Sequence, residues 1–315
     1  MNHTDDRKKN AADDRTVCTG TARTAISGRT AVYGLLGHPV AHTFSPLIHN
    51  TLAELTGENL VYEAFDAAAA EDVEAAVKGA FALNIQGLNV TVPYKQAVIP
   101  YLESLDPAAE KIGAVNTLVR TEHGYRGYNT DYTGLKKALE RNNASVTGED
   151  VVLIGAGGAA RAAAFLCGFD RAKSLTILNR TPAHAQSLAD AVSASFPELP
   201  VRVHALSEAG RLEGTGYIAI QCTKAGLAPD TESTPVADER FFKKVKFAYD
   251  AIYNPEDTLF LRMVREAGGR GACGIEMLLY QALAAYELWT GTRPDENAAE
   301  AVKQALRNYL HPRQC

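Results

Sequence analysis

The chain has 315 residues, enough for two domains or for one with a long insertion, and 46% of them are hydrophobic, enough for a sizeable core. Lys plus Arg number 32 against 37 Asp plus Glu, so the net charge of −5 supplies no positive field for nucleic acid. There is no apolar run of membrane-spanning length, and the five scattered cysteines form no C-x-x-C pair, so we expect a cytoplasmic protein without membrane contact or a disulfide framework.

The first 30 residues are rich in charge and lack periodicity, so they are expected to form a mobile leader. From residue 31 onward, strands and helices alternate. Ser45 is expected to cap, and Pro46 to open, a helix after the first strand. The other predicted elements are strands at 31–37, 60–65 and 86–92 and helices at 67–81 and 94–105.

A hairpin is predicted next, from 114–120 and 125–129, and the alternation then resumes. Short apolar strands are predicted at 151–154, 175–178, 201–204, 217–220 and 247–251, and residues 274–311 should be helical with a break near 291–294. Strand-helix alternation over most of the chain predicts an α/β fold with two mostly parallel, doubly wound layers.

A glycine-rich turn follows the predicted strand at 151–154. The sequence G-A-G-G-A-A at 155–160 matches G-x-G-x-x-A between a strand and an Ala-rich helix, a pattern typical of dinucleotide binding. The next strand ends in Asn179-Arg180-Thr181 without the acid that holds a ribose 2′-OH in NAD sites. Arg180 can pair with a 2′-phosphate, so NADP(H) is preferred and NAD(H) is kept as the second cofactor.

Polar side chains gather in three segments where strands should end, at 37–46, at 87–95 and at 112–116 with 128–131. Asn89 and Thr91 should share one face of their strand, leading to Lys95. Such side chains suit a polyhydroxylated ligand, and Lys95 could give a proton to a carbonyl oxygen with Asp131 as its partner. His38 and His42 have a spacing known from metal sites, but Pro39 between them opposes the necessary helix, so no metal is predicted.

Seven segments together resemble the shikimate dehydrogenase family in order and spacing, over about residues 31 to 312. They lie at 33–50, 89–95 (N-V-T-V-P-Y-K), 113–117, 129–131, 155–159, 179–181 and 274–281. The resemblance implies a substrate-binding α/β domain of residues 31–131 plus 275–315 and a Rossmann-like NADP-binding domain of residues 132–274. The C-terminal helices would then return to the first domain.

The resemblance also implies NADPH-dependent, reversible reduction of 3-dehydroshikimate to shikimate in aromatic amino-acid biosynthesis. It makes Lys95 the acid/base, with Asp131 as its partner. The residues it assigns to the substrate are Thr43 and Ser45 for the carboxylate, Asn89, Thr91, Asn116 and Gln281 for the ring hydroxyls or their support, and Tyr253 for the pocket wall. Those it assigns to the cofactor are Gly155, Ala156, Gly157, Gly158, Ala159, Asn179, Arg180 and Thr181, with Ala251, Gly274 and Met277 around the nicotinamide.

Three residues depart from the family pattern. Thr43 replaces a common serine and is expected to influence preference between shikimate and quinate; His184 replaces a second arginine and is expected to weaken NADP selectivity; Gln221 replaces an asparagine near the cofactor. Two alternatives stay open: a quinate/shikimate dehydrogenase with broader NAD(P) use, and a non-catalytic sensor of these acids. The chain is expected to be a monomer or a homodimer.

Overall fold

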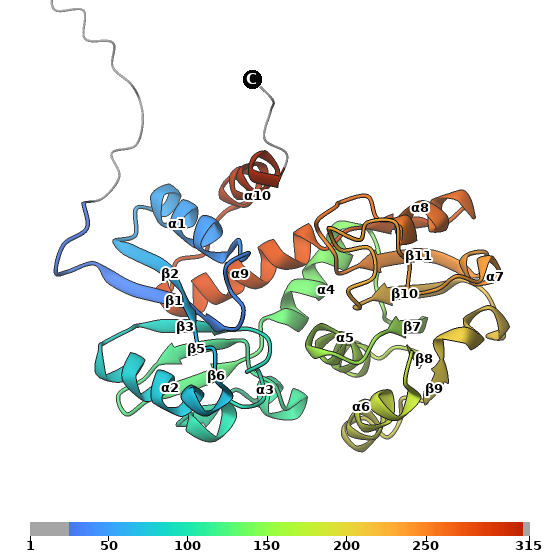
Figure 1. Cartoon of the computed structure of the whole chain (residues 1–315), viewed down its shortest axis with the longest axis horizontal. Helices are drawn as coiled ribbons and strands as arrows, with labels where there is room; N and C mark the ends of the chain where they lie inside the picture. Colours follow the sequence, from blue (N-terminus) through green and yellow to red (C-terminus); the bar gives the residue numbers. More distant parts are fainter. Residues whose placement is uncertain (1–24, 311–315) are drawn as a thin grey trace, which may run out of the picture.

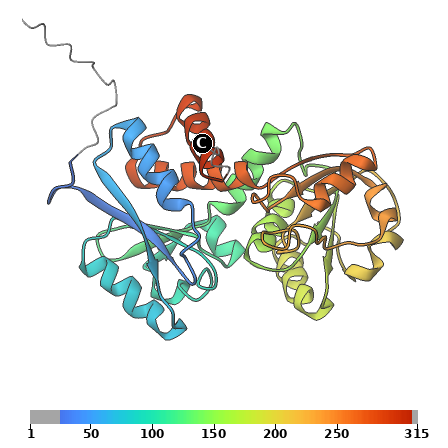
Figure 2. The same ribbon diagram turned by 45° about the horizontal axis from the view of Figure 1, so that its top comes forward.

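The computed structural model describes residues 25–310, so most of the predicted leader lies outside the described residues. Two six-stranded sheets lie at opposite ends of the molecule, joined by helices (Figure 1). The view turned by 45° keeps the same separation into two lobes (Figure 2). Among the described residues, no helix is both long and apolar enough to cross a membrane.

The sheet of the first lobe is mixed, with strand order β2-β1-β3-β5-β6-β4. Its strands are β1 (Ala31–Gly37), β2 (Leu60–Asp66), β3 (Gly87–Val90), β4 (Ser104–Leu105), β5 (Thr117–Arg120) and β6 (Tyr125–Tyr128). Strands β1, β2 and β3 run parallel, whereas β3, β5 and β6 pair antiparallel, which confirms the predicted hairpin. Its helices are α1 (Ser45–Thr56), α2 (Val73–Ala82) and α3 (Pro107–Ile112).

Two predicted elements of this lobe are wrong in extent or kind. The helix expected at 67–81 begins only at Val73, after a 3₁₀ turn at Ala70–Asp72. The helix expected at 94–105 is absent: residues 92–98 form turns, then a 3₁₀ turn (Ile99–Tyr101) and β4. The physical reason is competition for backbone groups, since the N–H groups of Glu103 and Asp106 bind carbonyls of Tyr125 and Gly127 and draw the segment onto β6.

The sheet of the second lobe is wholly parallel, with strand order β12-β11-β10-β7-β8-β9. Its strands are β7 (Asp150–Ile154), β8 (Ser174–Asn179), β9 (Val201–Ala205), β10 (Tyr217–Gln221), β11 (Val245–Asp250) and β12 (Arg270–Ala272), of which β12 was not predicted. This is the dinucleotide-binding order, in which the direction of winding reverses between β7 and β10 and leaves a crevice at their carboxyl ends.

Side-chain alternation along β7 explains the layers around this sheet. Val151 and Leu153 pack with α5 (Gly158–Phe169) and α6 (Pro182–Ser195), whereas Val152 and Ile154 pack with α7 (Glu239–Phe242) and α8 (Leu259–Glu266). Both faces are therefore covered, as expected for strands that are apolar on both sides.

Helices α4 (Asp131–Arg141) and α9 (Ile275–Thr290) pack against each other between the lobes (Figures 1 and 2). The main chains approach closely at Gly134, where a Cβ would lie 2.7 Å from the amide nitrogen of Gln281. Beyond this crossing, α9 and α10 (Glu296–Leu310) pack with α1, and Trp289 Nε1 donates to the Leu118 carbonyl 2.9 Å away. The helical C-terminal region and its break are as predicted.

Candidate active site

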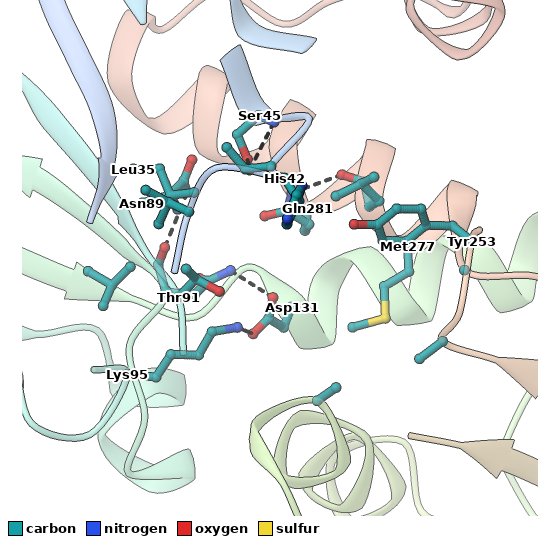
Figure 3. A pocket seen from close by; sticks show the side chains of 18 of the residues that line it. Leu35, His42, Ser45, Asn89, Thr91, Lys95, Asp131, Tyr253, Met277 and Gln281 are labelled. Carbon is teal, nitrogen blue, oxygen red and sulfur yellow. Dashed lines mark hydrogen bonds and ion pairs between the residues drawn. The ribbon is translucent and has the colours of Figure 1, made fainter. Parts of the chain in front are cut away.

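A cavity of about 360 Å³ lies between the two lobes. All seven residues expected to bind substrate, and the three expected around the nicotinamide, line it (Figure 3). Its predicted members are Thr43, Ser45, Asn89, Thr91, Lys95, Asn116, Asp131, Ala159, Ala251, Tyr253, Gly274, Met277 and Gln281. Segments far apart in the sequence are thus brought to one cavity, as the three polar segments and the terminal helices suggested.

Thr43 and Ser45 form the hydroxyl-bearing end of the cavity. Ser45 is the first residue of α1 and not its cap, which corrects the prediction: the cap position is Phe44, and no side chain caps the helix. Instead, the Ser45 amide donates to Thr43 Oγ1 at 3.2 Å, and Thr43 Oγ1 donates to Ser45 Oγ at 3.2 Å. Two hydroxyls next to a helix N-terminus form a pair of donors suited to a carboxylate.

Asn89 and Asn116 are buried, and their side-chain amides form hydrogen bonds within the protein. Asn89 Oδ1 accepts from the Tyr62 hydroxyl at 2.8 Å, and its Nδ2 donates to the Asn116 carbonyl at 3.2 Å. Asn116 Oδ1 accepts from the Thr130 amide at 2.7 Å, while its Nδ2 donates to Asp131 Oδ1 at 2.9 Å. Both asparagines therefore support the cavity wall and the aspartate within it.

Lys95 and Asp131 form an ion pair that faces the cavity (Figure 3). Lys95 Nζ lies 2.6 Å from Asp131 Oδ2, with side-chain exposures of 17% and 9%. The main chain of Lys95 is also held, because its carbonyl accepts from the Val115 amide at 2.7 Å. An ammonium with three donors, one of them bound to a carboxylate, has N–H groups left for a ligand in the cavity.

Tyr253, Met277 and Gln281 approach the cavity from the side of the second lobe and α9 (Figure 3). Burial raises the pKa of the Tyr253 hydroxyl, which therefore stays protonated. The Phe44 ring meets the Tyr253 ring edge-on, with centroids 5.6 Å apart, so aromatic contact closes this side between the lobes. Gln281 Nε2 donates to the Leu278 carbonyl at 2.8 Å, which leaves its oxygen available.

The glycine turn after β7 adopts the backbone that its sequence requires. Gly155 has φ of +111°, and its amide donates to the Leu178 carbonyl at 2.8 Å. A Cβ on Gly157 would meet no atom within 4 Å, so this loop presents open backbone to the cleft. A second cavity of about 260 Å³ lies beside it, and Lys95 lines this cavity as well as the first.

Asn179 ends β8, and Arg180 and Thr181 follow it, but none of the three lines either of these two cavities. Arg180 and Thr181 are exposed, and Asn179 Nδ2 donates to the Thr181 carbonyl at 2.8 Å. Within residues 25–310, Arg180 has no carboxylate partner, so its guanidinium is free to meet an anion from solvent.

Two features were not predicted, one in the cavity and one directly before the cavity residue Ala251. His42 lines the cavity beside Thr43 (Figure 3), and its place in the polar 37–46 segment was the available signal.

Asp250, at the end of β11, is fully buried; it accepts from the Ile252 amide at 3.0 Å and from Thr258 Oγ1 at 2.7 Å. Burial raises the pKa of Asp250 to about 6. Gln221 donates to the same carboxylate at 3.3 Å and to the Ala225 carbonyl at 3.2 Å, which ties the loop after β10 to β11.

Comparison with known proteins gives consistent matches along the chain. Residues 35–118 match the shikimate dehydrogenase substrate binding domain, residues 136–226 match shikimate / quinate 5-dehydrogenase, and residues 274–307 match the shikimate 5′-dehydrogenase C-terminal domain. The shikimate dehydrogenase (NADP⁺) of Moorella thermoacetica is 43% identical over 269 residues, which cover 84% of this chain and 90% of that protein.

Solved structures agree with this assignment. A crystal structure of shikimate dehydrogenase in complex with NADP⁺ superposes with a TM-score of 0.83 at 34% identity, covering 92% of this chain and 99% of that one. The Thermus thermophilus enzyme in complex with NADP(H) and shikimate gives a TM-score of 0.76 at 32% identity, with coverage of 87% and 99%. This chain therefore belongs to the shikimate dehydrogenase family.

Proposed function

We propose that this protein catalyses the reversible, NADPH-dependent reduction of 3-dehydroshikimate to shikimate. The observation that carries the proposal is the position of Lys95, which lines both the hydroxyl- and amide-rich cavity and the cavity beside the glycine turn. A proton donor at this junction can serve a carbonyl group that receives hydride from the cofactor side. Residues 31–131 with 275–315 would act as the substrate domain and residues 132–274 as the cofactor domain.

The substrate would bind with its carboxylate toward Thr43 and Ser45 and its ring between Thr91 and Gln281. The two hydroxyls are paired with each other and need only rotate to donate to a carboxylate. Asn89 and Asn116 act behind the ring as supports, because their amides are already engaged within the protein. Tyr253, neutral and close to Phe44, closes the cavity against water.

Lys95 would donate a proton to the carbonyl oxygen of the substrate during reduction and take it back in the reverse direction. Asp131 holds the ammonium at 2.6 Å, and Asn116 in turn orients the Asp131 carboxylate at 2.9 Å. This arrangement fixes the donor before the substrate binds, which lowers the entropic part of the barrier.

The residues around the second cavity fit a dinucleotide. The open backbone at Gly157 leaves room for a pyrophosphate, and the N-terminus of α5 offers free N–H groups. Ala251, Gly274 and Met277 would line the nicotinamide, and Asn179, Arg180 and Thr181 would hold the ribose phosphate end. When bound, NADPH supplies the hydride.

Absorbance of the reduced nicotinamide tests the proposal directly. The full-length protein is assayed with shikimate and quinate, each with NADP⁺ and NAD⁺. We expect the highest kcat/KM for shikimate with NADP⁺. Faster quinate turnover or equal use of NAD⁺ would favour a quinate/shikimate dehydrogenase with broader cofactor use. Binding of either acid without any absorbance change would favour a non-catalytic sensor of these acids.

A further inference from the structure

A short segment of the first lobe, residues 112–116, connects the helix of the glycine turn with both members of the Lys95–Asp131 pair. It begins with the last residue of α3 and leads into β5, and a side chain of the second lobe contacts its first residue. This side chain is that of Arg161, which no step of the proposed reaction uses. The inference drawn from it rests on the proposed function.

Arg161 lies in the first turn of α5, directly after the glycine turn. Its Nε donates to the carbonyl of Ile112 in the other lobe, and a Cβ on Gly113 would come within 2.9 Å of its Nη2. The guanidinium carbon lies 5.2 Å from the centre of the Phe165 ring. Arg161 is thus clamped between its own helix and the end of α3.

The positive charge of Arg161 is destabilised by partial burial. Burial lowers the pKa of this guanidinium, and within residues 25–310 no carboxylate pairs with it. The Arg161 guanidinium is half-buried, and its Nε–H donates to a backbone carbonyl of the other lobe. Such a cation adds little to stability compared with a well-packed apolar side chain. A role in fixing the relative position of the lobes accounts for its presence.

From Ile112 the contacts lead to the reacting groups within four residues. The Gly113 carbonyl accepts from Gln96 Nε2 at 3.4 Å, and the Val115 amide donates to the Lys95 carbonyl at 2.7 Å. The next residue, Asn116, donates to Asp131 at 2.9 Å. These contacts form a continuous path from the Ile112 carbonyl to the main chain of Lys95 and to the carboxylate that holds its ammonium.

We propose that Arg161 is a positioning residue: it locks the cofactor helix α5 onto residues 112–116 and so aligns the Lys95–Asp131 pair with the glycine turn. Arg161 lines the second cavity, beside the glycine turn, but not the substrate cavity, so binding of the acid is separate from this function. Hydride and proton transfer need aligned reactants, and a misplacement of about 1 Å can lower the rate about 100-fold.

The test compares Arg161→Ala and Arg161→Lys with Lys111→Ala in the full-length enzyme. Lys111 is the matched control, because it also joins α3 to the second lobe, with its Nζ 3.9 Å from the centre of the Phe196 ring, but it leads to neither reacting group. We expect Arg161→Ala to lower kcat at least about tenfold with KM for shikimate within about twofold, and Arg161→Lys to fall between it and the wild type. Lys111→Ala should keep both constants within about twofold.

Two further measurements separate positioning from general destabilisation. The primary isotope effect on kcat, measured with shikimate deuterated at the carbon that gives up hydride, should rise in Arg161→Ala, because hydride transfer becomes slower than product release. Millimolar guanidinium chloride, but not NaCl at equal ionic strength, should restore part of kcat by filling the vacated site. If Arg161→Ala does not fold, Arg161→Lys alone carries these measurements.

Wild-type turnover is measured first, so failure of the proposed reaction appears in the unsubstituted chain, whereas failure of the inference appears only between variants. Normal kcat in Arg161→Ala would overturn the inference. So would an equal loss in Lys111→Ala, or a loss of kcat with an unchanged isotope effect and no response to guanidinium.

Discussion

Lys95 is held by a main-chain hydrogen bond as well as by its side-chain ion pair. Removal of the ammonium should therefore affect proton transfer more than the shape of the cavity. We predict that Lys95→Ala lowers kcat by about 10² to 10⁴, the usual contribution of a general acid, with KM for shikimate little changed. Steady-state kinetics in both directions measure the effect. Lys173→Ala, which removes a lysine from an exposed pair with Asp150, is the control and should leave kcat unchanged. Comparable turnover in Lys95→Ala would remove Lys95 from the chemistry.

Arg180 tests the expected NADP preference. Since a hydrogen bond between charged groups contributes about 1.5 to 3 kcal/mol, Arg180→Ala should raise KM for NADP⁺ about 10- to 100-fold and leave KM for NAD⁺ nearly unchanged. His184, in the first turn of α6, supplies the opposite change: His184→Arg should lower KM for NADP⁺. Equal loss for both cofactors in Arg180→Ala would contradict a contact with the 2′-phosphate.

Site residues were predictable from the sequence where they belong to a short motif. Their hydrogen-bond partners were not predictable where these depend on the register of paired strands. Lys95, Asp131 and the glycines of 155–158 could be picked out from local sequence. The partners of Asn89 could not, because its bonds to Asn116 and Thr117 depend on the pairing of β3 with β5, 27 and 28 positions away. The same limit hid the buried contact between Gln221 and Asp250, which lie on neighbouring strands β10 and β11.

At the scale of elements, strands were predicted better than turns. Apolar runs specify the central strands of the second lobe, since both faces are covered. The segment after β3 has an apolar pattern compatible with a helix, but its backbone N–H groups bind β6, a contact that no local pattern records. The three-residue strand β12 is too short to produce any periodic signal.

Asp250 joins the end of β11 to the start of α8, and its ionisation should affect stability. Its pKa is about 6 in the folded chain against an ordinary 3.8, so the folded state favours the protonated form. Stability from this group is fully present below about pH 4 and is lost as pH rises from there through about 6, an effect of about 3 kcal/mol. Asp250→Asn cannot ionise and lacks this loss. Urea unfolding from pH 4 to 7 should show the free energy of unfolding of the variant gaining on that of the wild type by this amount; a constant difference would contradict the assignment.

At the scale of the whole molecule, the two sheets meet through α4 and α9, which carry site residues from the middle and from the C-terminal part of the chain. Asp131 begins α4, while Met277 and Gln281 project from α9 into the cavity. The return of the terminal helices was predictable from the family resemblance. The close approach of α9 to α4 was not predictable, because a glycine at position 134 is equally compatible with a weakened, exposed helix.

Gly134 should therefore be intolerant of even one added carbon. A Cβ there would lie 2.7 Å from the Gln281 amide nitrogen and 2.8 Å from the Met277 carbonyl, so Gly134→Ala must push α9 away from α4. We predict a loss of about 1 to 3 kcal/mol in the free energy of unfolding, together with lower kcat/KM, because Met277 and Gln281 move with α9.

Gly79, in α2, is the matched control, since a Cβ there would meet no atom within 4 Å. Gly79→Ala should raise the free energy of unfolding by about 0.5 to 1 kcal/mol through helix propensity alone and leave kcat/KM unchanged. Urea unfolding and steady-state kinetics on both variants measure the difference. Equal stabilisation by the two substitutions would mean that α4 and α9 have room to separate, and the alignment of the lobes would then have to come from other contacts, such as Phe44 with Tyr253.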